Sequence, residues 1–255
     1  MKPHIAITIP VKNCLYGLND SLLSLLGQKA LNQINLVVFV VDNQSDDKDE
    51  VKALVERVAN ESKLNIKYIL NEEPLGRVQN WNKCLSVLVS SGAAYGKLLF
   101  SGDTLEPECL LNQMAMLAMP WVSFTTGMHE VIPDEEGVSP YAMMHFDADT
   151  IFPSENALKL SLLKGNWFAG SVALPMFRVE LIKGLYFDEK LEWAADWKFW
   201  AELATKGHVS YQNKVLTKFY MKYRKGYKHL AGTNQAFVED NYVKQFIGLA
   251  LISLE

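Results

Sequence analysis

The chain has 255 residues, of which 49% are apolar, and a formal net charge of -4 at pH 7. This length is near the upper limit for one domain, and the apolar share is enough for a full core. The acidic balance disfavours a nucleic-acid partner, because proteins that bind nucleic acids present a concentrated basic surface. Three cysteines (Cys14, Cys84 and Cys109) are odd in number and lack CxxC spacing. They favour free thiols in a reducing compartment over disulfides or a zinc site.

The N-terminus leads directly into an apolar strand pattern at His4. No long apolar segment followed by a cleavage site precedes it, so we expect no signal peptide. No uncharged apolar run reaches the ~20 residues that a bilayer-spanning helix needs. The sequence therefore predicts a soluble, cytoplasmic protein.

Strand and helix patterns alternate through the first half of the chain. Apolar, β-branched runs predict strands, and apolar residues at helical spacing predict helices between them. The expected strands cover 4–11, 36–41, 66–70 and 97–100, and the expected helices cover 19–28, 48–60 and 77–90. Pro10 should end the first strand, because proline cannot donate to a strand ladder. This alternation predicts a three-layer α/β/α fold with a mostly parallel sheet and right-handed crossovers.

Polar residues follow the strands at their carboxyl ends, which is the edge where α/β proteins bind ligands. They occupy 10–13, 42–47, Asn71 and Asp103. No GxGxxG follows the first strand and no GxxxxGK[ST] occurs in the chain, so an NAD site and a P-loop are both disfavoured. The outline is that of a cleft sized for a nucleotide.

The second half has a looser pattern. We expect helices over 110–117, 154–164, 193–205 and 233–254, strands over 121–125 and 172–177, and a strand pair over 209–221. Residues 129–150 are acidic and weakly patterned, as in a long surface excursion. The last helix should turn Phe237, Val243, Phe246 and 249–250 inward. We interpret the chain as one globular unit in two halves, 1–118 and 119–255.

Five motifs occur in the order and at the strand ends of a known family. They are Ile9-Pro10-Val11-Lys12-Asn13, Val41-Asp42-Asn43-Gln44-Ser45-Asp46-Asp47, Gly76-Arg77-Val78-Gln79-Asn80-Trp81-Asn82, Ser101-Gly102-Asp103 and Glu192-Trp193-Ala194-Ala195-Asp196-Trp197. Together they resemble the inverting glycosyltransferases of family 2, which have the Rossmann-like GT-A fold and build bacterial surface polysaccharides. The resemblance covers roughly residues 4–225. It implies a nucleotide-sugar-binding half over 1–118 and an acceptor-binding half over 119–255.

The resemblance assigns a set of residues to the nucleotide-sugar donor. They are Pro10, Lys12, Asp42, Arg77, Gly102 and Asp103. Asp42 would accept hydrogen bonds from the ribose or base of the nucleotide. In the alternative interpretation, the Asp42 side chain forms an Asx turn with its own loop. Arg77 would bind the diphosphate with its planar fork, and its alternative is a solvated side chain in a first helical turn.

The resemblance also implies a Mg²⁺ or Mn²⁺ ion on Asp103 that bridges the diphosphate. Such ions usually take only one or two protein carboxylates. The family's DxD or ADD motif is here Ser101-Gly102-Asp103, so the first acid is missing. His229 is a second candidate ligand, and its alternative is an ordinary surface histidine. Asp103 also has an alternative role, as the cap of the following helix.

Asp196 is the candidate catalytic base, which would take the proton from the acceptor hydroxyl in an inverting transfer. Nearby tryptophans would desolvate it and raise its pKa. Its alternative role is to cap the helix over 194–205. The family usually has Glu-Asp at this point, and this chain has Ala195-Asp196. Trp167, Gly170 and Trp197 are the candidate acceptor-binding residues.

We therefore expect an inverting glycosyltransferase that moves a sugar from a nucleoside-diphosphate sugar to a glycan or lipid-linked acceptor. The alternative is a degenerate, non-catalytic homologue that binds a nucleotide-sugar or a partner enzyme, as the losses at Ser101 and Ala195 suggest. The final helix should pack on the core. A homodimer contact and a peripheral membrane contact are its other two interpretations.

Overall fold

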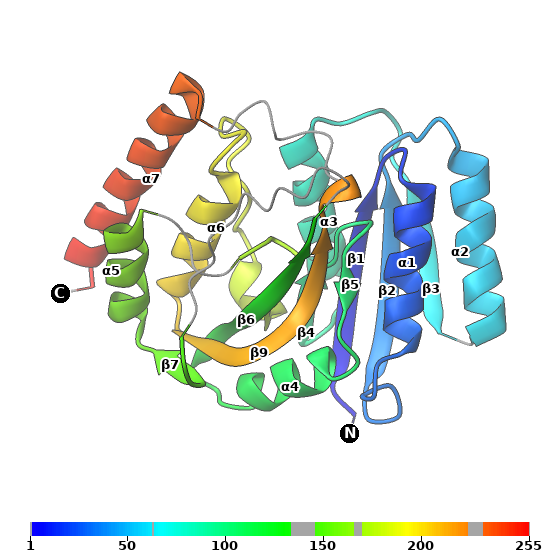
Figure 1. Ribbon diagram of the computed structural model, residues 1–255, viewed down its shortest axis with the longest axis horizontal. Helices are drawn as coiled ribbons and strands as arrows, with labels where there is room; N and C mark the ends of the chain where they lie inside the picture. The colour runs from blue at the N-terminus through cyan, green and yellow to red at the C-terminus, as the bar shows by residue number, and fades with distance from the viewer. Residues whose placement is uncertain (1, 63, 134–145, 166–169, 224–231, 255) are drawn as a thin grey trace.

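The computed structural model describes residues 2–62, 64–133, 146–165, 170–223 and 232–254, and within them nine strands form one sheet (Figure 1). The strands are β1 (His4–Val11), β2 (Asn35–Asp42), β3 (Asn65–Leu70), β4 (Tyr95–Leu98), β5 (Thr104–Leu105), β6 (Val122–Ile132), β7 (Thr150–Phe152), β8 (Met176–Arg178) and β9 (His208–Tyr220). The helices are α1 (Leu15–Leu26), α2 (Lys48–Ser62), α3 (Arg77–Ser90), α4 (Cys109–Leu117), α5 (Ser154–Lys164), α6 (Ala195–Ala204) and α7 (Asn234–Ile252), with 3-10 turns η1 (Val179–Ile182) and η2 (Met221–Tyr223).

The strand order is β3-β2-β1-β4-β8-β6-β9-β5, and β7 pairs with β9. The first four strands of this order are mutually parallel, as the alternating sequence pattern predicts. The second half is mixed: β8 runs antiparallel to both β4 and β6, whereas β6 and β9 are parallel. The longest pairings are parallel, so the expected mostly parallel α/β sheet is confirmed.

Two apolar clusters cover the two faces of the sheet. Ile5, Ile7 and Ile9 of β1 point into a cluster with α1, α2 and α4, whereas Ala6 points into the other cluster with α3, α6 and α7. This alternation is the period of two that a strand buried on both faces requires. In Figure 1, α1 and α2 stand beside β1–β3, and α5, α6 and α7 gather at the opposite end. The three-layer arrangement is confirmed.

The first strand continues through Pro10 to Val11, so the prediction that Pro10 ends it was wrong. The reason is the pairing on either side of β1. The register with β4 ends at Thr8, whereas the register with β2 continues to Val11. Pro10 therefore lies where one side of the strand has no partner, and its missing N–H removes no ladder bond there.

Helix α1 covers Leu15–Leu26, so it begins four residues before the helix predicted over 19–28. The added first turn contains Gly17, a residue of low helix propensity. In the structure Gly17 is buried within α1, and a Cβ there would lie 3.0 Å from Gly102 Cα. Gly17 is therefore a close backbone contact with the loop after β4.

Strand β9 is one 13-residue strand, where the sequence predicted a strand pair over 209–221. The polar residues Asn213 and Lys214 resemble a turn in the sequence. In the structure they form a bulge in β9 itself, because the register with β6 passes from Gly127↔Gln212 to Met128↔Val215 and leaves these two residues without a partner in β6. The bulge bends the ribbon without reversing it. Strand β6 itself continues to Ile132, into the segment predicted as a surface excursion; residues 134–145 lie outside the described residues.

Helix α7 packs on the core mainly through Ala236, Val243 and Ile247. The expected inward positions Phe237 and Leu249 are both 69% exposed, so that part of the prediction was wrong. The apolar residues of this helix are spread around its whole circumference, and its sequence pattern therefore did not identify the buried side. Within the described residues, no helix has both the length and the apolar character that crossing a membrane requires.

Candidate functional site

The loops that follow β1 and β2 are tied to each other at the carboxyl edge of the sheet. Asn13 Nδ2 donates to Asp46 Oδ2 (2.9 Å), and Asp46 N donates back to Asn13 Oδ1 (2.8 Å). Asn13 has a left-handed φ of 51°, a conformation that asparagine tolerates better than most residues. The buried Pro10 and the exposed Lys12 therefore precede a fixed turn, and the Lys12 side chain reaches solvent at the predicted donor edge.

Asp42 is completely buried at the end of β2. Its Oδ1 accepts from Ser45 N (2.9 Å), and its Oδ2 accepts from Tyr68 OH (2.8 Å). Burial, together with this hydrogen bond and the Asp42 charge, raises the pKa of Tyr68. The bond to Ser45 is the turn-forming contact of the alternative interpretation. Each carboxylate oxygen has a second lone pair, so a nucleotide contact at Asp42 stays a prediction.

The turn Ser101–Asp103 follows β4 and rests on α1 through one buried hydroxyl. Ser21 Oγ accepts from Gly102 N (3.0 Å) and donates to Asp103 O (2.7 Å). Asp103 is 1% exposed. The structure thus fixes the backbone on both sides of the Gly102–Asp103 peptide from a single side chain of the neighbouring helix. Ser21 was missed by the sequence analysis, although a serine among leucines on the buried face of a helix is a detectable signal.

Gly102 needs to be glycine for two reasons. Its φ is +99°, which favours glycine. A Cβ would also lie 2.7 Å from Tyr223 Cγ, because the Tyr223 ring packs against it. Tyr223 in turn donates its hydroxyl to Asp20 Oδ2 (2.8 Å). The segment after β9 is therefore fastened over the predicted donor turn by a residue that the sequence analysis did not identify.

A buried lysine lies beneath the same turn. Lys97 is completely buried in β4, and its Nζ donates to Leu174 O (2.6 Å) and to Gln113 Oε1 (3.3 Å). Burial lowers the pKa of Lys97 to about 8, while the charges of Cys109 and Asp103 act in the opposite direction. Gln113 Nε2 also donates to Leu174 O (2.7 Å). This cluster ties the strand that leads to Asp103 to the loop that leads into β8.

Arg77 is the first residue of α3 and is exposed. Its guanidinium carbon lies 5.0 Å from the centre of the Trp81 ring, within the range of a cation–π contact. The loop before it is ordered by Asn43, which donates to Leu75 O (2.8 Å) and accepts from Leu75 N (2.7 Å). Asn80 joins this network by accepting from Asn71 Nδ2 (2.9 Å). The guanidinium is thereby held at the edge of the sheet with its donors available to solvent.

Asp196 is in the first turn of α6 and is half-buried. Its Oδ1 accepts from Trp197 N (2.8 Å). The residue before the helix is Ala194, so Asp196 is not the N-cap of α6. Burial is the main cause that raises the pKa of Asp196 to about 6, and the Asp240 charge adds to it. The hydrogen bond from Trp197 and the charge of Arg77 act in the opposite direction and lower the pKa. Asp196 and Arg77, from the two halves of the chain, are thus close enough to interact electrostatically.

The predicted acceptor residues are placed very differently from one another. Trp197 is 4% exposed, and its Nε1 donates to Ser161 Oγ (2.7 Å), so its ring belongs to the core. Gly170 has a φ of +73°, and a Cβ there would lie 2.8 Å from His129 Nδ1. Trp167 and His229 both lie outside the described residues, as do Arg224 and Lys228.

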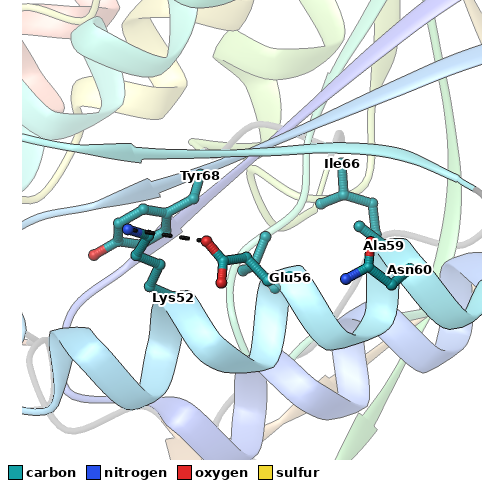
Figure 2. Close-up of a pocket in the computed structure, with 7 residues that line it drawn as sticks. Lys52, Glu56, Ala59, Asn60, Ile66 and Tyr68 are labelled. Carbon is teal, nitrogen blue, oxygen red and sulfur yellow. Dashed lines mark ion pairs between the residues drawn. The ribbon is translucent and has the colours of Figure 1, made fainter.

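A measurable hollow lies elsewhere, in the groove between α2 and the edge strand β3 (Figure 2). It has a volume of about 490 Å³ and is lined by side chains that include Lys52, Glu56 and Tyr68. Lys52 and Glu56 form an ion pair across one turn of α2 at 3.9 Å. Tyr68 links this groove to the strand-end residues described above, because its hydroxyl donates to Asp42.

Several solved structures share the fold of this chain. S. aureus TarS 1–349 in complex with UDP-GlcNAc aligns with a TM-score of 0.73 at 19% identity, over 96% of this chain and 66% of that chain. Its complex with UDP gives a TM-score of 0.72 at 18% identity, over 95% and 64%. The mannosyltransferase PcManGT from Pyrobaculum calidifontis, in complex with GDP-Man and Mn²⁺, gives 0.62 at 14% identity, over 99% and 75%. The chain thus spans slightly less than two thirds of the TarS 1–349 structures.

At these identities the matches show a shared fold. A search of curated protein sequences gave no significant match. The family model described as "Glycosyl transferase family 2" matches residues 6–185. That range is well over half of the chain and contains the loops described above after β1, β2, β3 and β4, whereas the turn before α6 and the segment after β9 lie beyond it. The chain therefore belongs to glycosyl transferase family 2.

Proposed function

We propose that this chain is an inverting glycosyltransferase. It moves a sugar from a nucleoside-diphosphate sugar to a hydroxyl of a glycan or lipid-linked acceptor. Family membership supports the reaction class. The observation that carries the assignment of roles is the half-buried Asp196 carboxyl, with a pKa of about 6 and within electrostatic range of Arg77. The proposed base, Asp196, thus interacts electrostatically with Arg77 of the donor-binding half.

In the proposed mechanism Asp196 takes the proton of the acceptor hydroxyl while the oxygen attacks the anomeric carbon in line. With a pKa of about 6 the carboxyl is ionised at neutral pH, yet it is a stronger base than an ordinary aspartate. General-base catalysis of this kind contributes about 10²- to 10⁴-fold. Residues 119–255 would bind the acceptor, and Gly170 adjoins His129 in this half.

Residues 1–118 would bind the donor. Arg77 and Lys12 are exposed cations at the strand-end edge and would contact the diphosphate. Asp42 would accept a hydrogen bond from the nucleoside. Tyr223, Asp20 and Ser21 would keep the Gly102–Asp103 backbone in place beside the diphosphate.

A divalent ion fits the oxygen chemistry of this edge. Asp103 offers a carboxylate at the end of β4, and ions bound to diphosphates take one or two protein carboxylates. Within the described residues, no group of three His, Cys, Asp or Glu could hold a metal ion. We therefore propose that Asp103 holds Mg²⁺ or Mn²⁺ only together with the diphosphate. The ion would supply positive charge to the leaving group.

Release of nucleoside diphosphate from UDP-GlcNAc and from GDP-Man, each with and without Mn²⁺, tests the proposal. We expect one donor to be turned over, and Asp196→Asn to lower the rate at least about 10²-fold because it removes the base. Glu202→Gln, on the same helix and half-exposed, is the matched control and should stay within about twofold. Full activity in Asp196→Asn would exclude Asp196 as the base.

The alternative function is binding without transfer. It is motivated by the single acid in Ser101–Asp103 and by the alanine that precedes Asp196. Thermal unfolding with UDP and GDP separates the two functions. A ligand at ~100-fold above its Kd adds about 2.7 kcal/mol of stability. A shift in the unfolding temperature without turnover of any donor would favour the non-catalytic function.

A further inference from the structure

The family model ends at residue 185, so α6 with Asp196 and the whole of α7 lie beyond it. In Figure 1 these two helices lie at the end of the molecule away from β1–β3. The turn 192–194 leads into α6, and the residue before the helix, Ala194, has no side chain that could cap it. The backbone amides of this turn therefore need an acceptor from elsewhere.

Glu239 of α7 supplies that acceptor. Its Oε2 accepts from Trp193 N (2.7 Å) and Ala194 N (2.9 Å), and its Oε1 accepts from Glu192 N (3.1 Å). The Glu239 residue is 5% exposed. Burial opposes its ionisation, but the hydrogen bonds from Ala194, Gln235 and the other amides outweigh burial and lower the pKa of Glu239. Both oxygens of this buried carboxylate thus accept hydrogen bonds from the turn 192–194.

The next residue of α7 holds the same turn by a side chain. Asp240 Oδ1 accepts from Trp193 Nε1 (3.1 Å). Trp193 therefore donates a hydrogen bond from its backbone to Glu239 and another from its indole to Asp240. The charged groups that act on Asp196 are Arg77 from α3, which lowers its pKa, and Asp240 from α7, which raises it.

We propose that Glu239 is the positioning residue for Asp196: by binding the amides of 192–194 it fixes the start of α6 and keeps the Asp196 carboxyl half-buried. Ala194 and Ala195 offer no side-chain acceptor at this turn, and the adjacent acids of α7 bring carboxylates to it from a different element. The inference rests on the proposed function, in which Asp196 is the base. If it is correct, α7 helps to position the proposed catalytic base.

The test is a direct titration of the Asp196 carboxyl by carbon-13 NMR in the full chain labelled at aspartate, because it needs no substrate. We expect Glu239→Ala to let water reach Asp196 and to lower its pKa by at least about one unit, a tenfold change in proton affinity. Glu239→Gln retains an acceptor oxygen for Trp193 N and Ala194 N, so we expect it to restore at least half of that shift. Gln245→Ala, at an exposed position of the same helix, is the matched control and should leave the Asp196 pKa unchanged.

An Asp196 pKa in Glu239→Ala within about 0.3 unit of the wild type would overturn the proposal. If Glu239→Ala does not fold, Glu239→Asp serves instead, because it keeps the charge but shortens the reach to the amides. Kinetics separate this inference from the proposed function. If Glu239→Ala shifts the Asp196 pKa but the wild-type protein turns over no donor, the proposed function is refuted and the positioning role stands. Wild-type kcat in a Glu239→Ala protein with a shifted pKa would refute the positioning of a base for catalysis and leave the transferase.

Discussion

Substitution of Gly102 by alanine tests the contact that fastens the end of β9 to the turn before Asp103. Two costs add at this position. The backbone has a φ of +99°, and holding a non-glycine residue in such a region costs about 1–3 kcal/mol. The new methyl group would lie 2.5–2.8 Å from Tyr223 Cδ2, Cγ and Cβ, and overpacking of this kind typically costs about 1–3 kcal/mol. We expect Gly102→Ala to lower the free energy of unfolding by about 2–6 kcal/mol.

The chain offers a matched control for the backbone term alone. Gly92 has a φ of +69°, and a Cβ there would meet nothing within 4 Å. Gly92→Ala should therefore cost only the left-handed backbone strain, about 1–2 kcal/mol. Urea unfolding followed by tryptophan fluorescence measures both variants under the same conditions. The difference between the two costs is the overlap with Tyr223.

A double-mutant cycle isolates that overlap. In a Tyr223→Gly background the ring and its Cβ are both gone, so the cost of Gly102→Ala should fall to that of Gly92→Ala. The expected coupling between positions 102 and 223 is about 1–3 kcal/mol. If Gly102→Ala costs no more than Gly92→Ala, or if its cost is the same with and without the Tyr223 ring, then the ring does not constrain Gly102 and the reasoning is refuted.

Two further predictions concern buried polar groups next to the same turn. Ser21→Ala leaves Gly102 N and Asp103 O without their partner and should cost about 1–3 kcal/mol; Ser90→Ala, an exposed helical serine, is the control, and equal costs would show that Ser21 does not hold the turn. For Lys97, burial lowers the folded-state pKa from 10.5 to about 8, so between these values the unfolded chain binds more protons and the free energy of unfolding rises with pH. From pH 8 to 9 the wild type should gain about 1 kcal/mol relative to Lys97→Met, and parallel stability curves for the two proteins would contradict the lowered pKa.

The sequence predicted the first half of the fold closely because strand and helix there alternate with strong periodicity. Helix α3 was predicted with both its bounds, and β1–β3 within one residue. The errors arose where a local signal was overridden by distant contacts. Gly17 does not break α1, because it is needed for the approach of Gly102. Asn213 and Lys214 do not form a turn, because β9 continues its pairing with β6 on both sides of them and they form a bulge in β9.

The candidate site was predictable only where residue type and strand end coincide. Asp42, Arg77 and Asp103 could be singled out because carboxylates and cations at strand ends have a limited set of uses. Glu239 could not, because it acts on backbone amides of a segment far away in the sequence. A contact with main-chain atoms leaves almost no trace in the identity of the partner residue. The raised pKa of Asp196 was expected from its tryptophan neighbours, although Trp197 itself lies in the core.

The hydrogen bond between Asp20 and Tyr223 joins residues 203 positions apart, and this has a consequence for how the protein matures. Contacts between such distant residues form late, because the loop-closure entropy is lost before the contact contributes. The Gly102–Asp103 turn therefore acquires its final surroundings only after β9 has paired with β5 and β6. During synthesis the amino-terminal strands and helices can assemble first, yet the donor edge would stay incomplete until the last part of the chain has emerged. A nascent or truncated chain would thus be folded over its first three strands before it could bind the proposed nucleotide-sugar.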